Sequence, residues 1–171
     1  MHDSLKWSAA ILALTLALTA PPALAAETPP KPDHLTLRPD PNVRRGVLPN
    51  GMRYQILRNA TPKDAVSLRF AIDVGSYEEA DAERGWAHFV EHMAFRSTRA
   101  FPDGGIDRAL AQAGVAFGRD QNAATTLFST VYQLDLPKAD DSQLANAFAW
   151  LRDIADGIVF TEDAVNHERG V

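Results

Sequence analysis

Hydrophobic positions recur at two different periods along this chain, and each period predicts one kind of secondary structure. From Ala65 to Val74 apolar and polar residues alternate, which is typical of a β-strand with one buried face. From about Arg84 to Phe95 the apolar residues lie three and four positions apart, as on the buried side of an amphipathic helix. Strands and helices are therefore both expected in one fold.

Turn-forming residues and further periodic segments predict the remaining elements. Asn50-Gly51 lies between two apolar runs, and Asn-Gly readily adopts the positive φ of a two-residue turn, so a β-hairpin is expected over Val43 to Leu57. The other expected elements are a helix at 106–113, strands at 122–126 and 129–136, a long helix at 141–157 and a shorter helix from about Thr161. This order of strands and helices permits an α+β fold.

The first 25 residues are expected to be a signal peptide rather than part of the fold. An apolar run from about Trp7 to Ala20 follows Lys6, and the small-residue sequence Ala23-Leu24-Ala25-Ala26 comes after it, so cleavage is expected after Ala25. The run is shorter than the roughly 20 residues that span a bilayer, so membrane attachment is expected only if the signal stays uncleaved. The mature chain is expected to be periplasmic or secreted.

A Pro-rich linker is expected over 26–42, and a folded domain over 43–171. Hydrophobic residues make up 46% of the chain and charged residues 23%, which is the balance of a globular protein with a core. A length of 171 residues gives room for one domain.

Charge and cysteine usage exclude several function classes. The net charge is −5 and the Lys and Arg residues are scattered, so no nucleic-acid partner is expected. The chain has no Cys, which excludes disulfides, thiolate metal ligands and a cysteine nucleophile. No Ser lies in a Gly-x-Ser-x-Gly turn, so serine hydrolysis has no support. A metal ion would have to be held by His and carboxylate side chains.

Such side chains cluster in the predicted helix at His88, Glu91 and His92. Each helical residue advances by about 100°, so the two histidines lie about 40° apart on one face with the glutamate beside them. Two imidazoles at this spacing can both bind zinc at roughly 2.0–2.1 Å, and the carboxylate can take a proton from a metal-bound water. A His pair merely packed inside a helix is the alternative. It is disfavoured, because burying these polar groups without a compensating charge is costly.

The residues around this cluster resemble the insulinase and pitrilysin family, whose His-x-x-Glu-His motif defines the inverzincins and which includes the mitochondrial processing peptidases. The resemblance covers about Leu48 to Val171. In chain order it consists of Leu48–Gly51, Gly75-Ser76 with Glu79, Gly85–Phe95, Phe117-Gly118, Asn122-Ala123, Thr130–Tyr132 and Glu168–Val171. It implies an α+β fold with a largely antiparallel sheet and helices packed on one face, here an incomplete N-terminal metallopeptidase domain.

The resemblance also implies residue roles. His88 and His92 correspond to zinc ligands and Glu91 to the general base. The family's third ligand is a Glu seven residues after the one that Glu168 matches, which is four positions beyond Val171, so Glu168 is expected to assist near the metal. However, Glu168 follows His92 by 76 residues, close to the family's usual separation between second His and ligand Glu, so a direct ligand role stays open.

Two further positions gain a role from the resemblance. Asn122 and Ala123 correspond to an edge strand that pairs with the backbone of the substrate, and an ordinary strand is the alternative. Glu79 is expected either to orient a metal-ligand histidine or to lie at the start of the helix.

The resemblance predicts a zinc endopeptidase that hydrolyses peptides with a Zn2+-activated water. The competing hypothesis is a catalytically silent module that binds a peptide or partner and lacks the third zinc ligand. Because family members close two such domains around the substrate, a second peptidase-like domain or chain is an expected partner.

Overall fold

The computed structural model describes residues 38–169. The expected signal peptide at 1–25 and most of the expected linker at 26–42 lie outside the described residues. One compact unit begins at Asn42 and contains all the helices and strands given below. Within 38–169, no helix is both long enough and apolar enough to cross a membrane.

All the elements expected from the sequence are present, and their ends differ from expectation by at most two residues. In chain order they are β1 Val43–Val47, β2 Arg53–Leu57, β3 Val66–Ile72, α1 Trp86–Arg96, α2 Gly105–Gln112, β4 Gln121–Thr125, β5 Thr130–Leu136, α3 Asp141–Asp156 and α4 Glu162–Glu168. Two short 3-10 turns that the sequence did not predict, η1 Ser76–Glu78 and η2 Asp81–Glu83, connect β3 to α1.

The first hairpin has a different turn from the one expected. Its connection is a three-residue loop, since the Leu48 N–H donates to the Met52 carbonyl at 2.8 Å across Pro49, Asn50 and Gly51. The Gly51 N–H donates back to the Leu48 carbonyl at 2.9 Å, and Gly51 takes a φ of +87°. Proline prefers the first central position of a type I turn, which leaves the left-handed conformation to the glycine at the end. The expected two-residue turn was therefore wrong.

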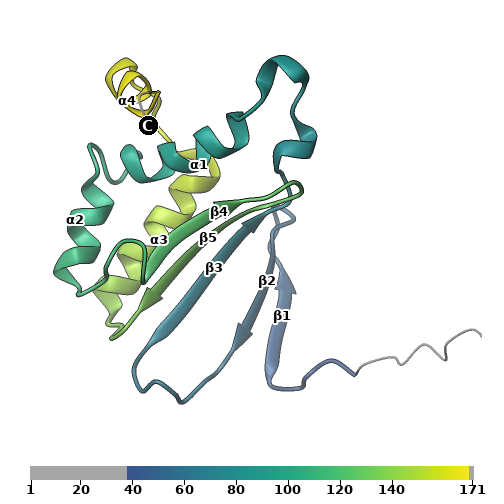
Figure 1. Ribbon diagram of the computed structural model, residues 1–171. Coiled ribbons are helices and arrows are strands. Elements are labelled where there is room, and N and C mark those ends of the chain that lie inside the picture. The colour runs from purple at the N-terminus through teal and green to yellow at the C-terminus, as the bar shows by residue number, and fades with distance from the viewer. Residues whose placement is uncertain (1–37, 170–171) are drawn as a thin grey trace, which may run out of the picture. The chain divides into compact units, whose positions relative to one another are not determined.

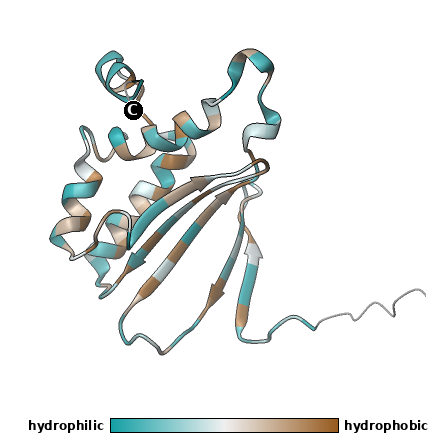
Figure 2. Ribbon diagram, in the orientation of Figure 1, coloured by the Kyte–Doolittle hydropathy of each residue, from teal (hydrophilic) through white to brown (hydrophobic). Residues whose placement is uncertain are grey.

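The main sheet is antiparallel with strand order β3-β5-β4, and β1 and β2 form a separate two-stranded sheet. Side chains of β5 alternate between buried and half-buried along the strand. The buried ones are opposite apolar residues of β3, as in the pairs Tyr132 with Phe70 and Leu134 with Leu68. Figure 2 shows this alternation of hydrophobic and hydrophilic positions along the strands. One face of the sheet is therefore apolar.

Helices α1, α2 and α3 lie on that apolar face (Figure 1). The core between the layers contains Trp150 of α3, which is fully buried, and the rings of Phe95 and Tyr132, with centroids 5.3 Å and 6.2 Å from that of Trp150. Aromatic groups of this size dominate the burial energy of a small core. The fold is the α+β class expected from the sequence, with antiparallel strands and helices on one face.

Candidate metal centre

Helix α1 is fixed at its start by a carboxylate. Gly85 precedes the helix with a φ of +92°, a conformation that glycine adopts without steric cost. Glu79 accepts hydrogen bonds from the backbone N–H groups of Gly85 and Ala87, each at 2.8 Å. The bonds from Ala87 and Gly85 lower the pKa of Glu79, because they stabilise its charged form. Of the two expected roles for Glu79, the structure supports the one at the helix start.

The last turn of the same helix is fixed by α3. The indole Nε1 of Trp150 donates to the carbonyl oxygen of Ala94 at 3.0 Å, and both residues are fully buried. This carbonyl is one of the last four of α1 and has no partner within the helix. Both ends of α1 are therefore held, and the side chains along it have a defined direction.

His88 and His92 present the same ring nitrogen to each other. Their Nε2 atoms are 3.0 Å apart and the rings meet edge to face, with an interplanar angle of 88°. One ligand atom from each of His88, Glu91 and His92 lies within 4.8 Å of the others. Two nitrogens bound to a tetrahedral ion at about 2.0–2.1 Å would be about 3.3 Å apart. The donor set and its spacing fit zinc.

Glu91 faces into the molecule and is 6% exposed. Its Oε2 accepts a hydrogen bond of 2.6 Å from the Thr125 hydroxyl on strand β4. Tyr132, also buried on this side of the sheet, has its pKa raised by burial and further by the negative charge of Glu91. The carboxylate therefore lies where helix α1 packs against β4 and β5.

Glu168 reaches the histidine pair from helix α4, which lies beside α1 (Figure 1). Its Oε1 lies 2.5 Å from Nδ1 of His92, and its Oε2 accepts from Nε of Arg96 at 2.5 Å. Burial acts to raise the pKa of Glu168, but the hydrogen bonds from His92 and Arg96 outweigh it and the pKa lies below its usual range. Glu168 thus contacts the ring nitrogen of His92 that faces away from His88.

Asn122 and Ala123 lie on β4, at one edge of the three-stranded sheet. Ala123 pairs with the buried Tyr132 of β5 and so shares the helix-covered face, whereas Asn122 belongs to the opposite face. The N–H of Ala123 donates to the side-chain Oδ1 of Asn122 at 2.9 Å, which indicates that it points away from β5. The structure brings both residues onto the strand that also carries Thr125.

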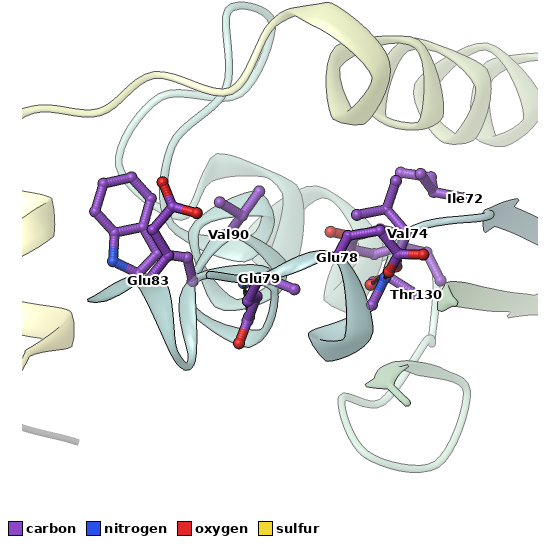
Figure 3. Close-up of a pocket in the computed structure, with 11 residues that line it drawn as sticks. Ile72, Val74, Glu78, Glu79, Glu83, Val90 and Thr130 are labelled. Atoms are coloured by element: carbon purple, nitrogen blue, oxygen red, sulfur yellow. Dashed lines mark hydrogen bonds between the residues drawn. The ribbon is translucent and has the colours of Figure 1, made fainter. Parts of the chain in front are cut away.

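A hollow of about 300 Å³ lies beside the first turns of α1. Its walls are mostly apolar, from Val74, Trp86, Val90 and Tyr132 among others, and three glutamates also line it (Figure 3). None of His88, Glu91 and His92 lines this hollow. It is therefore a neighbour of the candidate metal centre and not the centre itself.

Two residues of the site were missed at the sequence level. Arg96 lies one helical turn after His92, on the same face, a spacing that could have indicated a shared partner. Thr125 lies two positions after Ala123 and so on the same face of its strand, which could have indicated a side chain directed at the helix. Neither signal identifies the group that is contacted.

Comparison with known proteins identifies the family of the chain. Residues 54–171 match the model of the insulinase family, peptidase family M16. The chain belongs to the insulinase family. A relative in Haemophilus influenzae, named probable zinc protease PqqL, is 41% identical over 132 residues, and its Escherichia coli namesake is 37% identical over 161 residues. Both relatives are named probable zinc proteases, and the His88, Glu91 and His92 group is a donor set that zinc accepts.

Solved structures of proteases are similar to this chain in fold as well. The first half of the periplasmic protease PqqL from Escherichia coli is similar with a TM-score of 0.73 and 40% identity, over 77% of this chain and 28% of that one. The two PqqL relatives are much longer than this chain, whose matches cover 77% and 94% of it but only 14% and 16% of them. The similarity to insulinase-family proteins thus concerns their N-terminal part.

Proposed function

We propose that this chain provides the zinc-binding helix and the general base of a zinc endopeptidase. The observation that carries the proposal is the geometry of α1, where the Nε2 atoms of His88 and His92 are 3.0 Å apart and the Glu91 carboxylate lies beside them. A bound zinc ion would lower the pKa of a coordinated water towards about 7. Glu91 would accept the proton of that water and later donate it to the leaving amine.

We propose that Glu168 orients His92 and does not bind the metal directly. Both of its oxygens are already engaged, by Nδ1 of His92 and by Arg96. A carboxylate on the remote ring nitrogen fixes the tautomer of a ligand histidine and makes its other nitrogen a better ligand. The third zinc ligand would then be a carboxylate outside the described residues, and the family resemblance expects it four positions beyond Val171.

Asn122 and Ala123 are proposed to bind the substrate backbone. Strand β4 has a free edge in the described sheet, and the Ala123 N–H is satisfied only by the neighbouring Asn122 side chain. An extended peptide could replace that local hydrogen bond and add a strand at this edge. Recognition of this kind selects extended peptides rather than one sequence.

The proposed location is the periplasm or the outside of the cell, with 1–25 as a signal peptide. The similar Escherichia coli protein of known structure is described as a periplasmic protease. A second, similar domain that closes over the substrate is a further proposed partner, since the chain matches only a small share of its relatives.

A catalytically silent binding module is the second candidate. It is favoured by one observation, that the described residues bring only His88, Glu91 and His92 together as a metal-binding group, while the two oxygens of Glu168 are engaged by Nδ1 of His92 and by Arg96. Such a module would bind peptide at β4 and leave it intact.

Metal analysis and a peptide assay separate the two candidates. The proposed peptidase, in a protein that also contains the third ligand and the closing domain, contains about one zinc per molecule after dialysis against trace zinc, and it cleaves a quenched fluorescent peptide. Glu91→Gln should keep the metal and abolish cleavage, whereas His88→Ala should lose both. If that wild-type protein retains zinc and binds the peptide without cleaving it, the silent module is supported, and if it binds no zinc, the proposed function is overturned.

A further inference from the structure

Within the part of the chain that the structure describes, the Glu91 carboxylate has one oxygen fixed and one oxygen free. Thr125 Oγ1 donates to Oε2 at 2.6 Å. Among the residues that the structure describes, none donates a hydrogen bond to Oε1. In a carboxylate held in this way, one oxygen is bound to the protein and the other can accept a proton. The residue that holds it therefore decides where the free oxygen points.

The direction of this hydrogen bond follows from a count of protons. A carboxylate oxygen accepts hydrogen bonds, and the hydroxyl has one proton to donate, so Thr125 is the donor to Glu91. The Thr125 hydroxyl also lies 3.3 Å from that of Thr130, its cross-strand partner on β5. Thr130 itself donates to the Val74 carbonyl at 3.0 Å. Thr125 can donate to the Glu91 carboxylate or to the Thr130 hydroxyl. The hydrogen bond to the carboxylate is the shorter of the two, at 2.6 Å, and a carboxylate is the stronger acceptor.

The strand and the shape of the side chain both fix this threonine. Thr125 is the last residue of β4 and is opposite Thr130, which is 5% exposed and donates to the carbonyl of Val74, two residues after β3. The threonine side chain is also branched at Cβ, so its χ1 angle is restricted. The donor is thus held by the sheet rather than by a mobile loop.

We propose that Thr125 is a positioning residue, which orients the Glu91 carboxylate so that Oε1 faces the histidine pair. The proposal rests on the proposed function, because it assumes that Glu91 acts on a metal-bound water. It adds that the strand carrying Asn122 and Ala123 also holds the base. Pairing of a peptide with β4 and orientation of the base would then depend on the same strand.

The first test is a double-mutant cycle on the metal-free full chain, measured by urea unfolding. Thr125→Val keeps the shape of the side chain and removes the donor, which leaves a buried acceptor unpaired. We expect it to lower the folding equilibrium constant on the order of 10-fold. In a Glu91→Leu background the same change should be close to neutral, because both partners are then apolar. An equal loss in both backgrounds would overturn the proposal.

The second test uses cobalt in place of zinc, because the visible absorption of Co2+ responds to the water and ligands around it. The spectrum should change in Thr125→Val and return in Thr125→Ser, which restores the hydroxyl. Thr126→Val is the matched control, since that neighbouring hydroxyl bonds within the β4–β5 turn. It should reduce stability and leave the spectrum unchanged.

The possible failures are distinguishable. A wild-type chain that binds no cobalt overturns the proposed function, and the positioning role with it. A chain that binds cobalt normally, but whose Thr125→Val variant shows the wild-type spectrum, overturns only the positioning role of Thr125.

Discussion

Replacement of Glu168 by Gln tests how this carboxylate acts on the metal centre. Glu168 is 6% exposed and its two oxygens contact His92 and Arg96, each at 2.5 Å. Gln has the same shape but no charge, so Nδ1 of His92 would lose its anionic acceptor. Loss of such an outer partner typically costs 10–100-fold in metal affinity, or about 1.4–2.7 kcal/mol. We expect a loss of zinc affinity in this range.

The stability of the metal-free protein should fall by less. The Arg96 side chain is 39% exposed, so its ion pair with Glu168 is partly screened by solvent and contributes about 1 kcal/mol. Arg96 can also turn towards water when its partner is lost. Zinc affinity is therefore the more sensitive measurement.

Competition with a chromophoric chelator gives the zinc affinity of each variant, and urea unfolding followed by circular dichroism gives the stability. Glu162→Gln is the matched control, because Glu162 lies on the same helix and is exposed. It should bind zinc like the wild type. An unchanged affinity in Glu168→Gln would refute the orienting role, and a loss well beyond 100-fold would instead indicate that Glu168 is a direct ligand.

Three further predictions concern the framework of the site. Trp150→Phe removes the hydrogen bond to the Ala94 carbonyl and should lower the free energy of unfolding by about 1–3 kcal/mol, besides the lost packing of the larger ring. Gly75→Ala should cost about 1–3 kcal/mol, because an added Cβ would lie 2.7 Å from the Leu127 carbonyl oxygen and would push the β4–β5 turn away. Asp107→Asn should raise the melting temperature at pH 7. Burial raises the pKa of Asp107, so the folded state binds its proton more tightly than the unfolded state. The ionised form costs stability, which is recovered as the pH falls through the raised pKa and is fully regained at about pH 4, the ordinary value for Asp.

Each of these predictions has a simple check. Phe148 lies on the same helix as Trp150 but is 57% exposed, so Phe148→Leu should be nearly neutral in the same urea titration. Wild-type stability in Gly75→Ala would mean that the turn moves without cost. For Asp107→Asn, melting curves at pH 7 and pH 3.5 are compared, and a gain that is equal at both pH values would contradict the assigned cause.

The α1 helix and its zinc motif could be predicted because both depend on local spacing. Apolar residues at helical intervals indicated the helix, and the interval between His88 and His92 placed them on one face. The start of the helix was expected at Arg84 but lies at Trp86. The helix begins after Gly85, which has a left-handed backbone conformation and donates a hydrogen bond to Glu79, six residues before it. The periodicity of apolar residues contains neither signal.

The contacts of the site could not be predicted, because they depend on the packing of distant elements. Glu168 was expected near the metal, but the ring nitrogen of His92 that it contacts is determined by how α4 packs against α1. The bond from Thr125 to Glu91 depends on the register of β4 against β5 and on the position of α1 over both strands. Local sequence encodes neither quantity.

The contacts around α1 share a pattern that explains how a helix surface can serve as a preorganised site. Nδ1 of His92 is taken by Glu168 and Oε2 of Glu91 by Thr125, so each group has one atom engaged by the protein. What remains is Nε2 of His92, close to Nε2 of His88, and Oε1 of Glu91. A metal ion and its water require these atoms in fixed positions, and a fixed second atom on the same side chain is the simplest means of achieving this. In the proposed function, two elements far apart in the sequence, β4 and α4, therefore contribute to the chemistry together with the motif.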